Sequence, residues 1–303
     1  MRIVTRPDFD GIVCAVLLKE AEKITEPVKW VQPNDIQKGL VNIRKGDIIA
    51  NLPYDAGCSL WFDHHYTNRI TRPFKGAFEL APSAAHVVFK YYKHMLQRDY
   101  SELVNETDKI DAADLSMDEV LYPEKHPYLL LSMTIFGHDA AEERYWNRLV
   151  ELLGRLRIDN IIDDAGVAKR CRVVDAQNKQ YKVYLDEYTQ SMQHVCVTDF
   201  RPLDKTPDGN RFLIYALFPE TVVSVKIRYA GDAGEKVAVS VGHNIFNKNC
   251  NVNVGLMLSK FEGGGHRAAG SCRFNAGKAD DYIPEILDIL LKYEANYSLS
   301  HLY

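Results

Sequence analysis

Short apolar runs alternate with helix-length segments over the first 65 residues, and this alternation limits the folds open to the chain more than any other feature. The runs lie at residues 2–5, 28–31, 47–50 and 59–62 and are rich in β-branched and aromatic side chains. An apolar stripe with helical spacing follows the first run, over residues 11–23. Strands separated in this way are typical of an α/β fold with a mainly parallel, doubly wound sheet.

The pattern changes near residue 195, where turn signals begin to separate successive strand-like runs. The expected strands lie at 195–197, 212–215, 222–229 and 236–241, and two helices are expected near 252–261 and 279–293. A charged stretch with few helix breakers precedes them. We therefore predict an α/β domain over 1–164, a connecting helix over 165–194 and a smaller α+β domain over 195–303.

Composition excludes several classes of protein. The mean hydropathy is −0.26 and no apolar run has membrane-spanning length, so we expect no membrane association. The net charge of −4 argues against non-specific electrostatic binding along a nucleic acid, but it is compatible with local binding of a short strand. No signal peptide is read at the start and the six cysteines are scattered without a CxxC pair, so we expect a cytoplasmic protein with reduced thiols.

Ligand-type side chains follow three of the expected strands. Asp8 and Asp10 follow the first, Asn51 the third, and the triplet of Asp63, His64 and His65 begins as the fourth ends. Ligands of doubly wound sheets bind at the carboxyl ends of the strands, so these side chains should converge. Carboxylates gathered together repel one another unless a cation neutralises them, and oxygen ligands with imidazole suit Mn²⁺ or Mg²⁺.

Each piece also has a structural interpretation. Asp10 could simply cap the following helix, at about even odds on that segment alone. Asp108, Asp111 and Asp114 are more often a solvated helix face than ligands when taken alone.

A glycine-rich segment, GGGHRAAG at residues 263–270, follows the helix expected near 252–261. Its glycines could let a ligand approach the backbone, and His266 and Arg267 are suitable phosphate donors. Taken alone, the segment is better interpreted as a helix-to-strand turn with two surface side chains. Upstream, Asn244, Lys248, Asn251 and Asn253 could reach a nucleotide, although Asn251 could instead cap the helix; Arg228 is a further candidate phosphate contact.

Together these motifs resemble the DHH phosphoesterase superfamily, in the subgroup of RecJ-like, nanoRNase/pAp phosphatase-like and exopolyphosphatase-related proteins. The resemblance implies a two-domain hydrolase that holds one or two divalent cations, usually Mn²⁺, with Mg²⁺ or Co²⁺ as alternatives. The N-terminal DHH domain would hold the metal, and the C-terminal DHH-associated domain would bind substrate through Gly263, Gly264, Gly265, His266 and Arg267.

The resemblance also implies roles for individual side chains. Asp8, Asp10 and His64 would be metal ligands, and His65 would support the phosphate or the metal. A further aspartate ligand is expected downstream, with Asp111 the first choice and Asp108 the second. The catalytic set expected on this basis is Arg6, Asp8, Asp10, Asp63, His64 and His65.

Two departures from the family pattern affect the metal count. A histidine usually precedes the first aspartate, and here that place holds Thr5 or Arg6. An aspartate usually bridges two metals after the third strand, and here the matching residue is Asn51. A neutral amide bridges two cations poorly. Our hypothesis is one tightly held metal bound by Asp10, His64 and Asp111, with Arg6 partly replacing the second.

The leading prediction is a metal-dependent phosphoesterase that cleaves a short phosphate-containing substrate. Candidate substrates are a short single-stranded oligonucleotide, a pAp-like nucleotide or polyphosphate. The alternative is a non-catalytic nucleotide- or polyphosphate-binding protein with a degenerate metal site, motivated by Arg6 and Asn51. A processive exonuclease is disfavoured by the length and charge of the chain, and a homodimer is kept open as the oligomeric state.

Overall fold

The structure is a computed structural model that describes residues 1–136, 140–231 and 234–292. Its chain contacts separate two units. The first comprises residues 1–115 and 122–174, and the second comprises 116–121 and the chain from 175 onward. Helix α9, which spans Ala165–Tyr188, contributes residues to both units. Each unit has its own sheet and hydrophobic core.

The first unit contains a five-stranded sheet in the order β2-β1-β3-β4-β5, and every pair of neighbouring strands is parallel. The strands are β1 (Arg2–Thr5), β2 (Lys29–Trp30), β3 (Asp47–Ala50), β4 (Leu60–Asp63) and β5 (Gly76–Phe78). The predicted parallel α/β sheet is therefore confirmed. The edge strand β5 was not expected, because its three residues carry no distinctive pattern and pairing with β4 determines their conformation.

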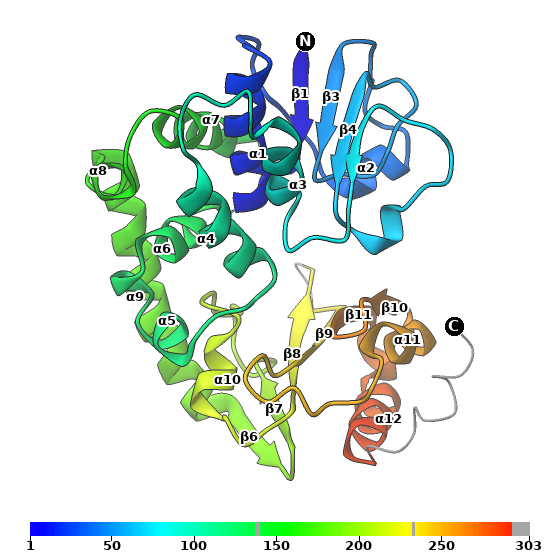
Figure 1. Ribbon diagram of the computed structural model, residues 1–303. Helices are drawn as coiled ribbons and strands as arrows, with labels where there is room; N and C mark the ends of the chain where they lie inside the picture. Colours follow the sequence, from blue (N-terminus) through cyan, green and yellow to red (C-terminus); the bar gives the residue numbers. More distant parts are fainter. Residues whose placement is uncertain (137–139, 232–233, 293–303) are drawn as a thin grey trace. The chain divides into compact units, whose positions relative to one another are not determined.

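Side chains that alternate along the strands bury both faces of this sheet. Ile3, Ile48 and Phe62 belong to the larger core, which includes side chains from α1 (Phe9–Ala21), α3 (Ala84–Tyr92), α4 (Ser101–Asp111) and α7 (Glu143–Leu153). Val4, Ile49 and Trp61 belong to a smaller core with Ile36 of α2 (Pro33–Gln37). Figure 1 shows α1, α3 and α7 gathered on one side of the strands.

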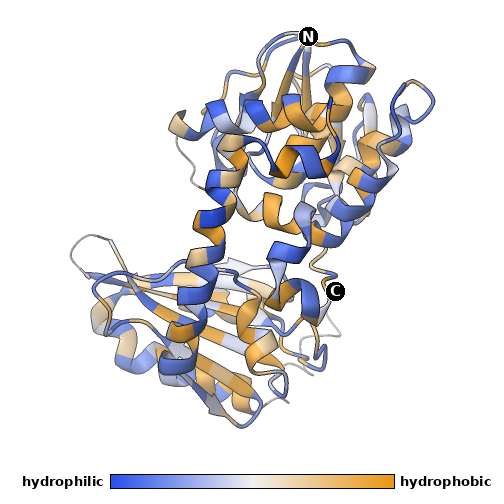
Figure 2. Cartoon of the chain, turned by 90° about the vertical axis from the view of Figure 1, so that its left-hand side faces the viewer, coloured by the Kyte–Doolittle hydropathy of each residue, from blue (hydrophilic) through white to orange (hydrophobic). Residues whose placement is uncertain are grey.

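Helix α1 is apolar around nearly its whole circumference, because α3, α4 and α7 all contact it. Its burial firmly positions the polar residues at its N-terminus. The remaining α-helices of the unit are α6 (Pro127–Met133) and α8 (Ile158–Ile162). Figure 2 shows hydrophobic residues concentrated on the strands and on the helices packed against them.

The second unit contains a mixed six-stranded sheet in the order β10-β11-β9-β8-β7-β6. Valine and isoleucine side chains on one face pack against α11 (Val254–Leu258) and α12 (Ala279–Leu291). Position 293, included in the expected second helix, lies outside the described residues. The strands are β6 (Thr189–Met192), β7 (Val195–Asp199), β8 (Val223–Ala230), β9 (Lys236–His243), β10 (Gly263–Gly265) and β11 (Ala269–Asn275).

Two expectations for the second unit were wrong. The aromatic and β-branched run at 212–215 is not a strand but lies mostly in helix α10 (Leu213–Leu217). Asn210, just before this helix, accepts a hydrogen bond from the Phe212 amide and donates one to the Val120 carbonyl of α5 (Met117–Leu121). Helix α10 packs against α5. The expected connecting helix ends at Tyr188 rather than 194, because Thr189–Met192 pairs with β7 as an edge strand.

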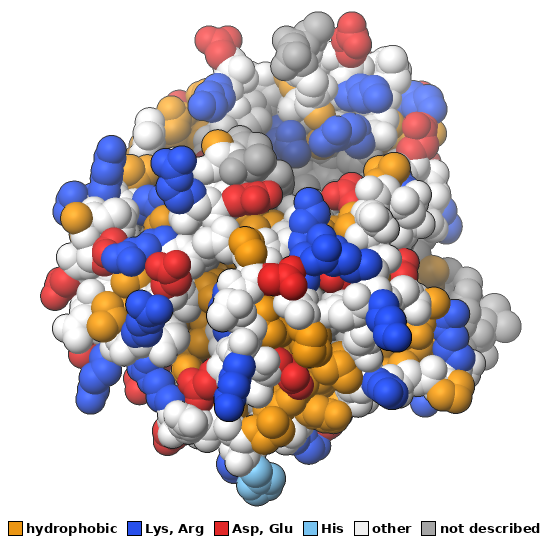
Figure 3. All heavy atoms as spheres, turned by 90° about the horizontal axis from the view of Figure 1, so that it is seen from above, with side chains coloured by type: hydrophobic (Ala, Val, Ile, Leu, Met, Phe, Trp, Pro, Cys, Tyr) orange, Lys and Arg blue, Asp and Glu red, His pale blue; other side chains and the backbone are white. Residues whose placement is uncertain are grey.

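The surface carries charges of both signs. On the face in Figure 3, Lys and Arg side chains are interspersed with Asp and Glu side chains. Within the described residues, none of the helices combines the length and apolar character needed to cross a membrane.

Candidate active site

The carboxyl end of β1 leads directly into the N-terminus of α1, and two aspartates lie at this junction. Asp8 caps the helix, since its Oδ1 accepts a hydrogen bond from the Gly11 amide at 2.8 Å. Asp10 lies in the first turn and is only 2% exposed. The cap predicted as an alternative for this segment therefore exists, but Asp8 provides it and Asp10 does not.

The N-terminus of α3 holds the buried Asp10 carboxylate. The Ala84 amide donates to Oδ2 at 2.9 Å and the Ala85 amide donates to Oδ1 at 2.7 Å. The Cys14 thiol, one turn further along α1, lies 3.8 Å from Oδ1. Free N–H groups at a helix N-terminus stabilise a negative charge. Asp10 is thereby oriented through contacts with residues more than 70 positions away.

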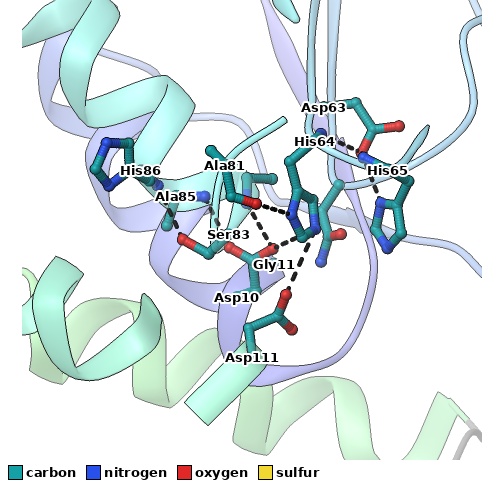
Figure 4. Close-up of polar contacts among 12 residues, drawn as sticks. Asp10, Gly11, Asp63, His64, His65, Ala81, Ser83, Ala85, His86 and Asp111 are labelled. Carbon is teal, nitrogen blue, oxygen red and sulfur yellow. Dashed lines mark hydrogen bonds and ion pairs between the residues drawn. The ribbon is translucent and has the colours of Figure 1, made fainter. Parts of the chain in front are cut away.

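His64 follows β4 and presents an unsatisfied nitrogen to two carboxylates (Figure 4). Its Nδ1 lies 3.0 Å from the Ala81 carbonyl oxygen, which can only accept, so Nδ1 carries the proton of the neutral ring. The Nε2 lone pair then lies 3.8 Å from Asp10 Oδ2 and 3.4 Å from Asp111 Oδ2. Nε2 is buried and has no hydrogen-bond partner among the described residues.

Asp10, His64 and Asp111 therefore form a compact group of ligand atoms, all within 4.8 Å of one another. Burial, then the charge of nearby Asp8, raises the pKa of Asp10 to about 7. Burial, then the charge of Asp10, raises the pKa of Asp111 to about 7. A lone pair that faces two carboxylates is an unfavourable arrangement that a cation between them relieves. Oxygen and imidazole ligands of this kind fit a divalent cation.

Asp63 and His65 form a second, hydrogen-bonded group beside the first. Asp63 is fully buried, and its Oδ1 lies 2.8 Å from His65 Nδ1 and also accepts from the His64 amide at 2.9 Å. Its Oδ2 accepts from the Asn68 side chain at 2.6 Å. Burial lowers the pKa of His65, but the hydrogen bond and charge of Asp63 outweigh this effect, and the net pKa is raised. Asp63 therefore orients His65 and the loop after β4.

Asp8 has partners of its own. Its Oδ2 forms an ion pair with Arg6 Nε at 3.1 Å, and its Oδ1 accepts from Asn51 Nδ2 at 3.0 Å. Burial raises the pKa of Asp8, whereas the Arg6 charge and the Gly11 amide lower it. Asn51 adopts a left-handed backbone (φ 56°), a conformation that asparagine tolerates better than most residues. The two departures noted in the sequence, Arg6 and Asn51, thus contact the same carboxylate.

Of the two downstream aspartates, Asp111 lies with Asp10 and His64, whereas Asp108 has a different set of partners. Asp108 accepts from the Ser83 hydroxyl at 2.6 Å and lies 2.8 Å from His86 Nδ1. Ser83 in turn caps α3 by accepting from the His86 amide. This network positions the helix N-terminus that holds Asp10. His86 therefore supports the site through Asp108, a role that the sequence pattern did not indicate.

The glycine-rich segment of the second unit is an edge strand, not only a turn. Strand β10 pairs antiparallel with β11, with Gly263 opposite Cys272 and Gly265 opposite Gly270. A Cβ at Gly263 would lie 2.4 Å from Cys272 Cβ, whereas a Cβ at Gly264 would meet nothing within 4 Å. Close packing therefore requires glycine at 263, and Gly264 leaves open space.

Side chains expected to bind substrate in this unit occupy different environments. His266, Arg267 and Lys248 are exposed. Arg228 lies on β8 and its Nη1 donates to the Tyr229 carbonyl at 3.4 Å. Asn253, not Asn251, caps α11, which corrects the capping alternative.

Asn244 belongs to the scaffold of its loop. It is 1% exposed, and its amide donates to the Thr221 carbonyl and accepts from the Phe246 amide. Burial and these intramolecular partners give Asn244 a structural role in its loop, and its role as a substrate contact stays a prediction.

Comparison with known structures identifies proteins that share this architecture. The pGpG-specific phosphodiesterase PggH from Vibrio cholerae is 30% identical, with a TM-score of 0.83 over 96% of this chain and 99% of that one. RecJ from Thermus thermophilus in complex with Mn²⁺ is 12% identical, with a TM-score of 0.55 over 96% of this chain and 52% of that one. No protein-family model and no curated protein sequence matches the chain.

A parallel sheet that gathers carboxylates and imidazoles at its strand ends, followed by a second α/β unit, defines a phosphoesterase of the DHH type. The full-length similarity to PggH makes the assignment specific. The chain belongs to the DHH family of phosphoesterases. The fold predicted from the sequence and the family resemblance are both confirmed.

Proposed function

We propose that this phosphoesterase hydrolyses the phosphodiester bond of a linear dinucleotide and that it uses one bound divalent cation, with pGpG the first substrate to test. The observation that carries the metal requirement is the buried His64 Nε2 facing Asp10 and Asp111 without a hydrogen-bond partner among the described residues. The similarity to a pGpG-specific phosphodiesterase over 96% of this chain and 99% of that one supports a dinucleotide as the substrate. A net charge of −4 also favours a short substrate over a long nucleic acid.

Each side chain of the first unit has a proposed task. Asp10, His64 and Asp111 hold the cation, which when bound polarises a phosphoryl oxygen and makes water a better nucleophile. His65, oriented by Asp63 through Nδ1, directs its other ring nitrogen to a phosphate oxygen. Mn²⁺ is the ion of first choice, with Mg²⁺ and Co²⁺ as alternatives.

The second unit carries phosphate-binding candidates of its own. Exposed His266, Arg267 and Lys248 have the charge and reach to bind phosphate oxygens, and Gly264 leaves room for a ligand to approach the backbone. Arg228 remains a candidate contact on β8.

The test is hydrolysis by the full chain with Mn²⁺. The substrates are pGpG, pApA, pAp, a longer oligonucleotide and polyphosphate, and products are separated by chromatography. We expect mononucleotide release from the dinucleotides, and loss of turnover in His64→Ala but not in His94→Ala, an exposed histidine near the end of α3. Tight dinucleotide binding without turnover would instead favour the non-catalytic binding protein.

A further inference from the structure

The carboxylates near the N-terminus of α1 differ in the partners that balance their charges. Asp10 and Asp111 face His64 Nε2, which has no hydrogen-bond partner among the described residues. In contrast, Asp8 already forms an ion pair with Arg6 and accepts hydrogen bonds from Asn51 and the Gly11 amide. We infer that the site holds a single divalent cation, and that the Arg6 guanidinium occupies the electrostatic role of a second one. This inference rests on the proposed metal-dependent function.

The charges balance with one cation. Two carboxylates, Asp10 and Asp111, match one divalent ion, and a neutral His64 contributes only a lone pair. The carboxylate of Asp8 is matched by the single charge of Arg6 at 3.1 Å. A second divalent ion at Asp8 would lie against the Arg6 guanidinium, whose charge repels a cation. Asn51 offers a buried Oδ1 without a hydrogen-bond partner among the described residues, but this neutral amide supplies no negative charge to offset that repulsion.

Asp63 and His65 do not offer a second cation site. Both oxygens of Asp63 accept hydrogen bonds, from the His64 amide and the Asn68 side chain, and Oδ1 also contacts His65 Nδ1. A cation there would have to displace several of these contacts from a fully buried carboxylate. The group orients His65 and is complete without an ion.

Arg6 has N–H donors that its ion pair with Asp8 does not use and that can bind substrate. A guanidinium carries five N–H donors, and the ion pair with Asp8 uses the one at Nε. Its side chain is 41% exposed, so the two Nη groups can reach a phosphate oxygen in the bidentate geometry that arginine favours. Arg6 is therefore assigned as a catalytic residue that neutralises Asp8 and contacts the reacting phosphate.

Metal stoichiometry tests this inference independently of turnover. The full chain is loaded with Mn²⁺, freed of excess ion and analysed by mass spectrometry of the metal, and calorimetric titration with Mn²⁺ gives the number of sites. We expect one tightly bound ion in the wild type and in Arg6→Lys. We expect two in the double variant Arg6→Ala with Asn51→Asp, because two adjacent carboxylates without a positive partner then require a cation. The matched control Arg148→Ala removes an arginine–aspartate ion pair elsewhere in the first unit and should retain one ion.

Two tight ions in the wild type would overturn the inference, as would a single ion in a folded double variant. The wild-type count decides the matter even if the double variant does not fold. A protein that binds one ion yet hydrolyses none of the substrates would refute the proposed function while leaving the single-cation assignment intact.

Discussion

His64 Nε2 lies 3.4 Å from Asp111 Oδ2, and it has no hydrogen-bond partner in the described part of the chain. The opposite side of the ring is held at Nδ1 by the Ala81 carbonyl, so the lone pair cannot turn away from the carboxylates without losing that contact.

Mn²⁺ should stabilise the protein against heat through His64. A ligand present at 100 times its dissociation constant adds about 2.7 kcal/mol, which corresponds to roughly 5 °C or more in Tm for a unit of this size. We expect this shift in thermal melts of the wild type and of His94→Ala, and none in His64→Ala. An undiminished shift in His64→Ala would show that the ion binds elsewhere.

The metal-free protein should lose stability as pH rises. The pKa of Asp10 and of Asp111 is raised to about 7 in the folded chain, against about 3.9 for an unfolded aspartate. The folded state therefore binds more protons between these values, and its free energy of unfolding falls as pH rises from about 4 to 7. Denaturant titrations in chelator should show this fall, and saturating Mn²⁺ should reduce it. An unfolding free energy that does not change between about pH 4 and 7 in chelator would contradict the raised pKa values of Asp10 and Asp111.

Asp108 and Asp111 should differ in what their replacement changes. Asp111→Asn removes a ligand and should abolish tight Mn²⁺ binding with little effect on the fold. Asp108→Asn weakens the hydrogen bonds to Ser83 and His86, so we expect a loss of about 1–2 kcal/mol in unfolding free energy. Because the same network positions Asp10, metal affinity should also fall by roughly 10-fold. Calorimetry measures the Mn²⁺ affinity and denaturant titration measures the unfolding free energy. If Asp108→Asn abolished Mn²⁺ binding and Asp111→Asn mainly lowered stability, Asp108 would be the ligand and Asp111 the supporting residue.

Asp63→Asn should impair catalysis while leaving the metal in place. The variant keeps Asn68 and the two histidines but disturbs the acceptor that orients His65 Nδ1. We expect kcat to fall by about 10- to 100-fold, in line with losses of supporting contacts, with one Mn²⁺ still bound. Loss of the ion in a folded Asp63→Asn protein would instead make Asp63 a ligand.

Two neighbouring glycines should respond differently to alanine. Gly263→Ala places a Cβ 2.4 Å from Cys272 Cβ and should destabilise the second unit by about 1–3 kcal/mol through overpacking. Gly264→Ala meets nothing within 4 Å and should leave the melting temperature unchanged. If substrate approaches this strand, Gly264→Ala raises KM for a dinucleotide with little change in kcat. An unchanged KM would remove β10 from the substrate site.

Local sequence was sufficient to predict four of the five strands of the first unit and their parallel arrangement. Alternating strands and helices predicted the parallel sheet, and the position of Asp10 and His64 after buried strands predicted their convergence. Asp111 became a candidate only through the family resemblance. Expectations failed where distant contacts decide conformation. Residues 212–215 have the composition of a strand, yet Asn210 and packing against α5 make most of them helical. The edge strands β5 and β6 exist because a neighbouring strand pairs with them.

The sequence by itself determined which chemical groups this protein has and that they follow buried strands, because hydrophobic periodicity and chain order are local properties. Only the tertiary structure decided what each group does. Asp8 and Asp10 are two positions apart, yet Arg6 neutralises the first and Asn51 donates a hydrogen bond to it, whereas the N-terminus of α3 holds the second beside His64. The physical reason is that the state of a carboxylate depends on the donors and charges within a few ångströms of it, and here most of them come from distant parts of the chain.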